Sequence, residues 1–303
     1  MATLLDFRRR IRSVKNTQQI TRAMKFVAAA RLRRAQEAAL AARPYAMELA
    51  RVLRSTMARI ESPEHPLLAK RSEERILVIV LAGERGLAGA FNSNILKKAY
   101  EFIRSKPGKK IVTVPVGKKG RDSLRKAGFE FAAEYTNVLA RVDYGTAREI
   151  SKLVTELYSK DSIDAVYIVF SEFKTVMTPV LAVEKLLPIE KIEAESEKQP
   201  SSEPDGKSSH APPTVGGEID YIYEQPETQI LGRLLPRYVE TQILRAMLES
   251  SAAEHAARMT AMEAATRNAG EVIEALTLHM NKVRQAAITK EIIEIVSGAS
   301  YTA

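Results

Sequence analysis

The sequence predicts a mixed α/β protein whose two ends form long helices that pair as a coiled coil and whose middle forms a small α/β domain. All but two of the fourteen glycines and all but one of the thirteen prolines lie between Pro63 and Pro236, so both ends are almost free of helix breakers. Both ends contain heptad-spaced apolar residues, and strand-like and helix-like segments alternate between them. We therefore divide the chain into an N-terminal coiled-coil helix over 1–60, an α/β domain over 61–236 and a C-terminal coiled-coil helix over 237–303.

Residues 4–59 are expected to form one long helix, because Pro44 is the only helix breaker among them. At a rise of about 1.5 Å per residue, such a helix would be roughly 80 to 90 Å long. Its seam starts with apolar residues and continues in the same phase through small or polar ones: Leu4, Phe7, Ile11, Val14, Gln18, Thr21, Lys25, Ala28, Leu32, Ala35, Ala39 and Ala42. Because this seam would bury little apolar area per residue, we expect another protein to enclose the paired helices.

The first 60 residues are strongly basic. They contain fourteen lysines and arginines against three acidic residues, a net charge of +11, whereas the whole chain carries +9. Such a helix favours an acidic partner, which could be nucleic acid, an anionic membrane surface or an acidic protein cavity. Charge alone does not choose among them, and a basic helix solvated by counterions would have the same composition.

Strand-like and helix-like segments alternate in the middle of the chain. The sequence predicts strands over 76–82, 110–116, 164–173 and 178–187 and helices over 92–104, 118–127 and 145–159. This order indicates a small parallel or mixed sheet covered by helices, in a Rossmann-like arrangement.

A glycine-containing loop over 83–92 (GERGLAGAFN) follows the first predicted strand. Sheets of this kind often bind nucleotides, but the loop matches neither the G-x-x-x-x-G-K-[ST] phosphate loop nor the G-x-G-x-x-G fingerprint. We interpret it as a tight strand-to-helix turn with Asn92 or Ser93 near the start of the helix. We expect no nucleotide and no other cofactor to bind there.

Residues 193–218 are rich in Ser, Pro, Glu, Lys and Gly and contain almost no apolar residue. They cannot bury enough surface to order themselves, so we expect a flexible surface insert. A strand-like alternation resumes over 219–223, and Pro226 and Pro236 precede the last helix. The insert is therefore expected to lie within the α/β domain.

The last helix carries a second heptad seam. Its members step by three and four residues and comprise Ile273, Leu276, Met280, Val283 and Ala287, after which Ile292, Ile295 and Val296 shift phase. Residues 252–265 contain seven alanines that would let two helices approach closely. A helix pair with such small side chains would be slim and only modestly stable alone.

The sequence contains no recognisable catalytic or metal site. It has no cysteine, and His65, His210, His255 and His279 are too far apart for a metal-ligand spacing. No Ser-His-Asp signature occurs, and Glu291 with Glu294 is most simply a solvated helix face. No apolar stretch approaches the roughly 18 residues of a transmembrane helix, so we expect a soluble chain in a reducing compartment that has no membrane anchor and is not itself an enzyme.

Segments near both ends resemble one family. Residues 11–30 (IRSVKNTQQITRAMKFVAAA), 32–36 (LRRAQ) and 43–45 (RPY) resemble the amino-terminal signature of the ATP synthase gamma subunit. Residues 237–242 (RYVETQ), 254–262 (EHAARMTAM) and 281–296 (NKVRQAAITKEIIEIV) resemble its carboxyl-terminal signature. The resemblance covers essentially the whole chain.

The resemblance implies the rotor shaft of a bacterial-like F-type complex. In this family the terminal helices form an antiparallel coiled coil inside the ring of alternating alpha and beta subunits, and the globular domain stands on the c-subunit ring beside epsilon. Ion flow turns the c ring and shaft together, and the shaft drives the beta sites through different conformations. The chain would thus be a non-catalytic subunit of a proton-transporting complex, peripheral at the cytoplasmic face of the inner membrane.

The resemblance also implies residue roles. Contacts with the beta subunit are implied for Arg8, Arg9, Met24, Lys25, Arg284, Gln285 and Thr289, of which the last three correspond to positions at the catch loop. Arg8 and Arg9 would meet acidic loops around the shaft, and Met24 and Lys25 lie near the beta lever region. Tyr221, Tyr223 and Glu224 correspond to a tyrosine-rich strand near the c ring and epsilon. Alternatively, each of these residues on the terminal helices is simply part of the helix surface or of the seam and contacts no partner.

Some positions depart from the family pattern. In the loop usually written D-R-G-L-C-G-G-x-N, this chain has Glu84, Ala88 and Ala90 in place of Asp, Cys and Gly, so any role of that cysteine is absent. The insert over 193–218 lacks the paired cysteines of the redox-regulated chloroplast form. Glu263 and Arg267 stand where the family often has a cation and an acid, which indicates a swapped charge pair.

A coiled-coil protein that binds nucleic acid through its basic first helix is the alternative function. Two observations argue against it: residues 237–303 are nearly balanced in charge, with seven basic residues and eight glutamates, and aromatic residues do not interleave with the basic ones. A nucleotide-binding α/β enzyme is a third possibility, but the chain lacks the phosphate loop that such an enzyme would be expected to have.

Overall fold

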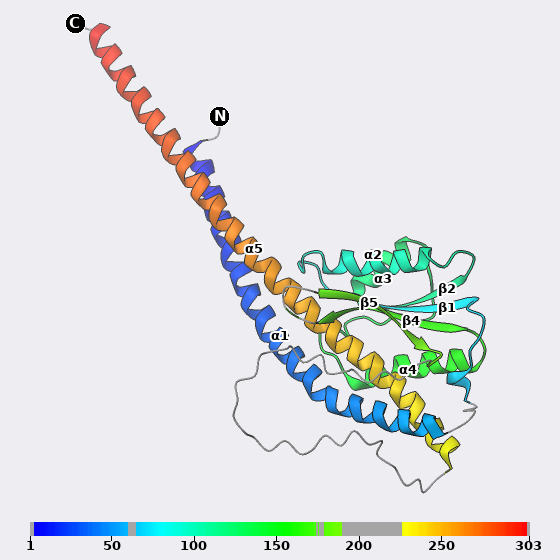
Figure 1. Ribbon diagram of the computed structural model, residues 1–303. Coiled ribbons are helices and arrows are strands. Elements are labelled where there is room, and N and C mark those ends of the chain that lie inside the picture. Colours follow the sequence, from blue (N-terminus) through cyan, green and yellow to red (C-terminus); the bar gives the residue numbers. More distant parts are fainter. Residues whose placement is uncertain (1–2, 60–64, 174, 176–178, 190–225, 302–303) are drawn as a thin grey trace, which may run out of the picture. The chain divides into compact units, whose positions relative to one another are not determined.

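The computed structural model describes residues 3–59, 65–173, 175, 179–189 and 226–301 (Figure 1). The elements in chain order are α1 (Leu4–Arg59), η1 (Pro66–Leu68), β1 (Arg75–Leu81), α2 (Phe91–Arg104), β2 (Lys110–Val116), α3 (Lys118–Lys126), β3 (Glu130–Phe131), α4 (Tyr144–Ser159), β4 (Ala165–Phe173), β5 (Pro179–Leu187) and α5 (Glu227–Tyr301). The predicted insert over 193–218 lies outside the described residues. The mixed α/β class predicted from the sequence is confirmed.

The chain divides into two compact units, which are described separately. The helical unit comprises residues 1–32, 87–89 and 254–303, and the sheet unit comprises residues 33–86 and 90–253. Both α1 and α5 are continuous helices that contribute residues to each unit. None of the described helices has an apolar stretch long enough to cross a membrane.

The sheet unit contains a five-stranded sheet in the order β3-β2-β1-β4-β5. The first four strands are parallel, and β5 runs antiparallel to β4. Ile79 of β1 lies between Val114 of β2 and Ile168 of β4. Because β1 is central and covered on both faces, all of its residues after Arg75 are buried, which explains the uninterrupted apolar run in the sequence.

Helices cover both faces of the sheet. In Figure 1, α2 and α3 lie over one face and α4 lies on the opposite side. Leu77 and Ile79 of β1 belong to a buried cluster that also contains Leu53 of α1 and Ile150 of α4. Six residues of α5 belong to the same cluster: Leu231, Leu235, Val239, Ile243, Ala246 and Met247. The core of the sheet unit is therefore built partly from the two long helices.

The predicted strands and helices of the sheet unit agree with the observed bounds to within one residue, but the start of α5 was predicted ten residues too late. The predicted start of the last helix is Arg237, directly after Pro236, whereas the helix begins at Glu227 and contains that proline. A proline inside a helix crowds the turn before it. α5 nevertheless continues through Pro236, as α1 continues through Pro44.

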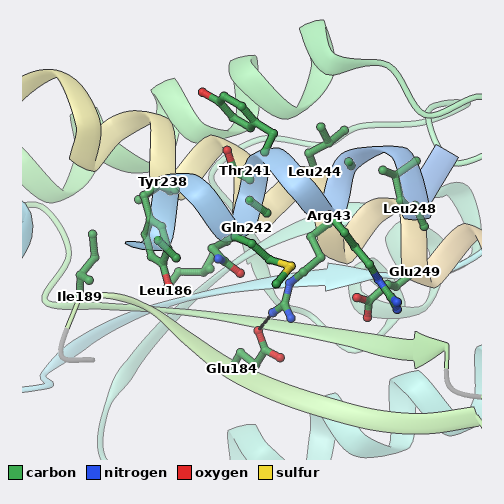
Figure 2. A pocket seen from close by; sticks show the side chains of 18 of the residues that line it. Arg43, Glu184, Leu186, Ile189, Tyr238, Thr241, Gln242, Leu244, Leu248 and Glu249 are labelled. Atoms are coloured by element: carbon green, nitrogen blue, oxygen red, sulfur yellow. Dashed lines mark hydrogen bonds and ion pairs between the residues drawn. The ribbon is translucent and has the colours of Figure 1, made fainter. Parts of the chain in front are cut away.

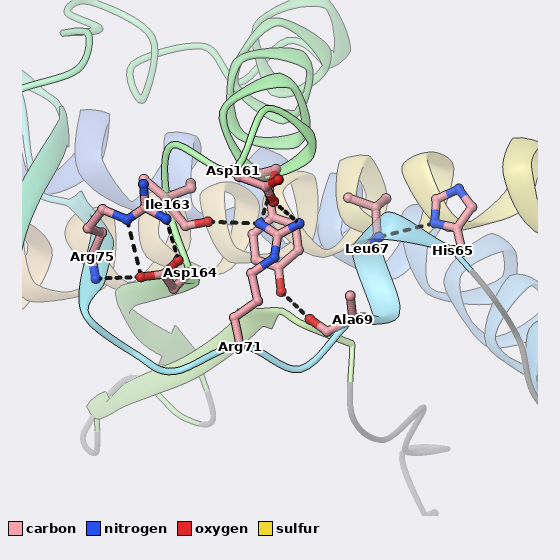
Figure 3. A network of polar contacts seen from close by, with 9 residues as sticks. His65, Leu67, Ala69, Arg71, Arg75, Asp161, Ile163 and Asp164 are labelled. Carbon is pink, nitrogen blue, oxygen red and sulfur yellow. Dashed lines mark hydrogen bonds and ion pairs between the residues drawn. The ribbon is translucent and has the colours of Figure 1, made fainter.

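A polar network joins the segment before β1 to the end of α4 (Figure 3). The Arg71 guanidinium donates hydrogen bonds to the backbone carbonyls of Tyr158 at 2.6 Å and Ile163 at 3.2 Å and lies 4.4 Å from the centre of the Tyr158 ring. Arg75 donates its backbone N–H and its guanidinium to the Asp164 carboxylate, both at 2.8 Å, and this pairing lowers the pKa of Asp164. These bonds fix β1 beside β4.

Candidate functional site

In the helical unit, the start of α1 and the end of α5 pack side by side and run antiparallel. The rings of Phe7 and His279 have centroids 5.0 Å apart, and the Lys25 ammonium lies 2.6 Å from a carboxylate oxygen of Glu263. Residue numbers therefore rise along one helix and fall along the other. This arrangement agrees with the antiparallel pairing that the resemblance implied.

The predicted seam is the buried side of this pair. Within the helical unit, every seam residue of α1 from Leu4 to Leu32 is buried or half-buried, whereas the residues just outside the phase are mostly exposed. The five seam residues predicted for α5, from Ile273 to Ala287, are all half-buried. The heptad phase is thus confirmed, including the part made of small and polar residues.

Hydrogen bonds across the helices occupy the polar part of the seam. Thr21 and Thr266 share a hydrogen bond of 2.8 Å between their hydroxyls, and the Gln18 amide donates to the Thr266 carbonyl at 3.4 Å. Gly270 makes room for Gln18, because an added Cβ there would lie 3.2 Å from the Gln18 amide nitrogen. Cross-helix polar contacts therefore replace the apolar packing that this stretch lacks.

Lys25 is the partner of the swapped charge at Glu263. Its ammonium donates to the Glu263 carboxylate at 2.6 Å, and this hydrogen bond lowers the pKa of Glu263, with a smaller contribution from Arg267. The Lys25 side chain is 33% exposed and that of Glu263 is 57% exposed. Met24, the neighbouring predicted contact residue, is half-buried.

The end of α5 extends beyond its pairing with α1. Since Phe7 lies against His279, Leu4 at the start of α1 lies opposite the turn of α5 that contains Lys282. The predicted contact residues Arg284, Gln285 and Thr289 are all exposed in this unopposed stretch, where the Thr289 hydroxyl donates to the Gln285 carbonyl at 3.0 Å. Between 49% and 71% of the surface of five neighbouring apolar residues is exposed: Ile288, Ile292, Ile293, Ile295 and Val296.

The paired part of α1 exposes both cations and apolar residues. Arg8 and Arg9 are exposed, and neither forms an ion pair with any residue in the described part of the chain. Ile20, Phe26 and Val27 are 60%, 62% and 53% exposed. These three residues were not predicted as contact residues, although the sequence shows that they are apolar and lie outside the heptad phase.

A group of buried polar side chains lies on α5 where the helical unit's third segment begins, at residue 254. Glu254 and His255 are 3% and 4% exposed, and the Arg258 guanidinium donates to Glu254 at 2.5 Å. Burial, followed by the positive charges of Arg258 and Arg31, lowers the pKa of His255 to about 4. His255 is therefore neutral at pH 7. No group of His, Cys, Asp and Glu suited to hold a metal occurs among the described residues.

In the sheet unit, the glycine-containing loop is held by the chain itself. The Glu84 carboxylate accepts hydrogen bonds from the backbone N–H of Lys118 at 3.0 Å, in the first turn of α3, and of Val138 at 3.1 Å. Asn92 accepts a hydrogen bond from the backbone N–H of Gly83 at 2.8 Å. A helix N-terminus after a strand is where a Rossmann-like fold binds phosphate, and here a carboxylate of the protein occupies that position.

Gly117 makes this arrangement possible. Its φ is +102°, and a Cβ built on it would lie 1.8 Å from the Ala82 carbonyl oxygen. Only glycine allows β1 and the start of α3 to approach so closely. Tyr221, Tyr223 and Glu224, the residues predicted to lie near the c ring and epsilon, fall outside the described residues.

Comparisons with known proteins match the whole chain. A family model described as ATP synthase matches residues 3–301. An ATP synthase gamma chain from Solibacter usitatus is 47% identical over 304 residues, which cover 99% of each chain. One from Chlorobium phaeobacteroides is 45% identical and covers 99% of this chain and 98% of the relative.

Solved structures with a similar fold come from rotary complexes. A chain in the rotor of the Euglena gracilis mitochondrial ATP synthase has a TM-score of 0.61 at 21% identity and covers 94% of this chain and 98% of its own length. A chain in a structure of OSCP, F1 and the c-ring from the same organism has a TM-score of 0.64 at 22% identity, covering 99% of this chain and 94% of that one.

Proposed function

Because this chain belongs to the ATP synthase gamma-chain family, we propose that it is the central rotor shaft that couples ion-driven rotation of the c ring to conformational cycling of the catalytic beta subunits. Its partners are the alpha and beta subunits, which alternate in a ring, the epsilon subunit and the c-subunit ring. The bond-forming chemistry takes place in the beta subunits, and this chain contributes mechanically. It would be a peripheral protein at the cytoplasmic face of the inner membrane.

One observation carries the proposal furthest: the end of α5 is unopposed and exposes four isoleucines and a valine within residues 288–296. A contiguous apolar surface of this kind is costly in water and is typical of a region that a partner covers. A ring of subunits that encloses the end of the shaft would supply such a cover. The relatives named ATP synthase gamma chain match this chain through this segment as well.

A shaft transmits torque only if its sides differ, because each orientation must favour one conformation of a surrounding beta subunit over the others. The helical unit meets this condition because the exposed surfaces of its two helices differ in charge. Arg8 and Arg9 are exposed on α1, whereas Glu271 and Glu274 are exposed on α5. Rotation would present these groups to each beta subunit in turn.

Named contacts follow from this geometry and from the family. We assign Arg284, Gln285 and Thr289 to the catch loop of beta, since all three are exposed on the unopposed end of α5. Arg8 and Arg9, which are exposed cations, would meet acidic loops through charge-assisted hydrogen bonds. Lys25 would act near the beta lever region together with Glu263, because the two side chains are already paired.

The proposed contacts with the c ring and the epsilon subunit are supported only by the resemblance to the family. Tyr221, Tyr223 and Glu224 would lie near the c ring and epsilon. The division into a coiled-coil helix over 1–60, an α/β domain over 61–236 and a second coiled-coil helix over 237–303 belongs to the same proposal.

Co-purification and activity test the proposal. The chain expressed with the alpha and beta subunits should form a stoichiometric complex that resists high salt and hydrolyses ATP. Replacing both Gln285 and Thr289 with alanine should lower hydrolysis by the reconstituted complex and leave the helicity of the isolated chain unchanged. Undiminished turnover would refute the assigned contacts, whereas DNA binding that persists without any alpha–beta complex would refute the shaft itself. The comparisons give the nucleic-acid alternative no support.

A further inference from the structure

The sheet unit contains an open cavity of about 620 Å³ that the rotor function does not use (Figure 2). Four parts of the chain line it: residues within 39–54 of α1, residues within 238–249 of α5, residues within 184–189 at and after the end of β5, and Tyr144 at the start of α4. Its volume falls within the range of small-molecule sites, about 300 to 1,000 Å³.

The walls of the cavity are largely apolar. Leu186, Ile189 and Leu248 supply buried side chains, and each is less than 9% exposed. Met47 and Tyr45 of α1 also line the cavity and remain 42% and 52% exposed. A flexible methionine and an aromatic ring left exposed beside an apolar cavity are suited to contact a ligand with an apolar body.

The charges around the cavity are unequal. Five cationic side chains and two carboxylates line it: Arg43, Arg51, Arg54, Lys185, Arg245, Glu184 and Glu249. Several of the cations have partners of their own: Arg245 pairs with Glu184 at 2.5 Å, Lys185 with Glu73 at 2.9 Å, and Arg51 with Glu48 at 3.0 Å.

Arg43 differs from these cations. It is exposed, and within the described part of the chain it forms no hydrogen bond and no ion pair. Figure 2 shows its side chain beside the cavity, near Leu248 and Glu249. One guanidinium is thus left to bind an anion next to an apolar wall.

We propose that this cavity binds an amphipathic carboxylate, with its apolar chain against Leu186, Leu248 and Met47 and its head group at Arg43. A guanidinium binds a carboxylate through two parallel hydrogen bonds, which fixes the orientation of the head group. The five cations and the four carboxylates that line the cavity or pair with these cations leave a net charge of +1, which matches a monoanion better than a di- or triphosphate. The ligand would contact α1, β5 and α5 together, so its binding would stabilise the sheet unit by mass action.

Calorimetric titration of the full-length chain with decanoate tests the site, with 1-decanol as the neutral counterpart. We expect saturable binding of one decanoate per chain. Arg43→Gln should weaken decanoate binding about tenfold, the size expected for a charge-assisted hydrogen bond, and should leave decanol binding nearly unchanged. Arg34→Gln is the matched control, because Arg34 is an exposed arginine of α1 that does not line the cavity.

A second variant tests the cavity itself. Ala46→Trp would fill the space and should abolish binding of both probes, whereas Ala38→Trp, at an exposed alanine of the same helix outside the cavity, should not. Circular dichroism tests whether both tryptophan variants are folded. If Ala46→Trp does not fold, the comparison of wild type with Arg43→Gln still tests the proposal. Absence of saturable binding, or equal decanoate affinity in the wild type and Arg43→Gln, would overturn the proposal. Neither result bears on assembly with alpha and beta, which tests the rotor function separately.

Discussion

Single buried carboxylates hold distant parts of the sheet unit together. Glu84 accepts hydrogen bonds from backbone amides 34 and 54 residues further along the chain, and Asp164 binds the amide of Arg75, 89 residues before it. The sequence identified the glycine-containing loop correctly as a turn, but it could not reveal that Glu84 fills the anion position at α3. The partner amides carry no side-chain signal, and only the fold brings them near.

Asp164→Asn should destabilise the sheet unit by about 1–3 kcal/mol, because the variant loses a charged acceptor of three hydrogen bonds from Arg75. Urea unfolding followed by circular dichroism measures the change. Asp161→Asn is the matched control: its side chain is 72% exposed, and Arg71 keeps its hydrogen bonds to the Tyr158 and Ile163 carbonyls, so the loss should stay within about 0.5 kcal/mol. Equal effects of the two variants would contradict the role given to Asp164.

His255 should make the protein less stable in acid. Its pKa is lowered to about 4 in the folded chain, below the 6.5 of an ordinary histidine, so the unfolded state binds a proton first as the pH falls. Its contribution to stability is complete above pH 6.5 and is lost progressively as the pH approaches 4. Urea midpoints between pH 7 and pH 4 should therefore fall less steeply in His255→Gln than in the wild type. If the urea midpoints of the two proteins fell equally steeply with pH, His255 would not be held in its neutral form by burial in the folded chain.

Among the helices, heptad phase was a better guide to structure than helix-breaking residues. The 3-4 spacing that starts at Leu4 predicted the buried side of α1 even through Gln18 and Thr21, because helix geometry fixes which residues share a face. Pro236, in contrast, was wrongly taken as the boundary before the last helix. The two-residue strand β3 was also missed, since Glu130 and Phe131 are too few to form a pattern.

The unopposed end of α5 should matter for assembly and hardly at all for folding. Ile292 and Ile295 are 55% and 71% exposed, so replacing both with serine should change the stability of the isolated chain by less than about 0.5 kcal/mol. The same change should weaken binding to the alpha–beta ring, because it removes apolar area that the ring would cover. Val272→Ser, at a 46% exposed position farther from the end, is the control. Unchanged assembly of the double variant would place the covering partner elsewhere.

At the scale of the whole molecule, two units of different composition share two continuous helices. The sheet unit has a core of large side chains, including Leu53, Ile79, Phe170 and Ile243, which are fully buried. The helical unit is held by a seam of small and polar residues between α1 and α5, with hydrogen bonds at Thr21 and Lys25 in place of large apolar contacts. Since buried apolar area is the main source of stability, the two units should differ in their free energy of opening.

Hydrogen exchange on the isolated chain should separate the two units. Backbone amides of residues 4–32 and 254–296 are expected to exchange well before those of β1 and β4. Phe7→Ala, which removes a ring that is 7% exposed and packs on His279, should speed exchange in the helical unit and leave the strands unchanged. Leu5→Ala, at a 54% exposed position two residues earlier, should alter neither. If Phe7→Ala instead accelerated exchange in both units equally, the two units would open as one cooperative body coupled through the continuous helices. A structural change in the helical unit would then alter the stability of the sheet.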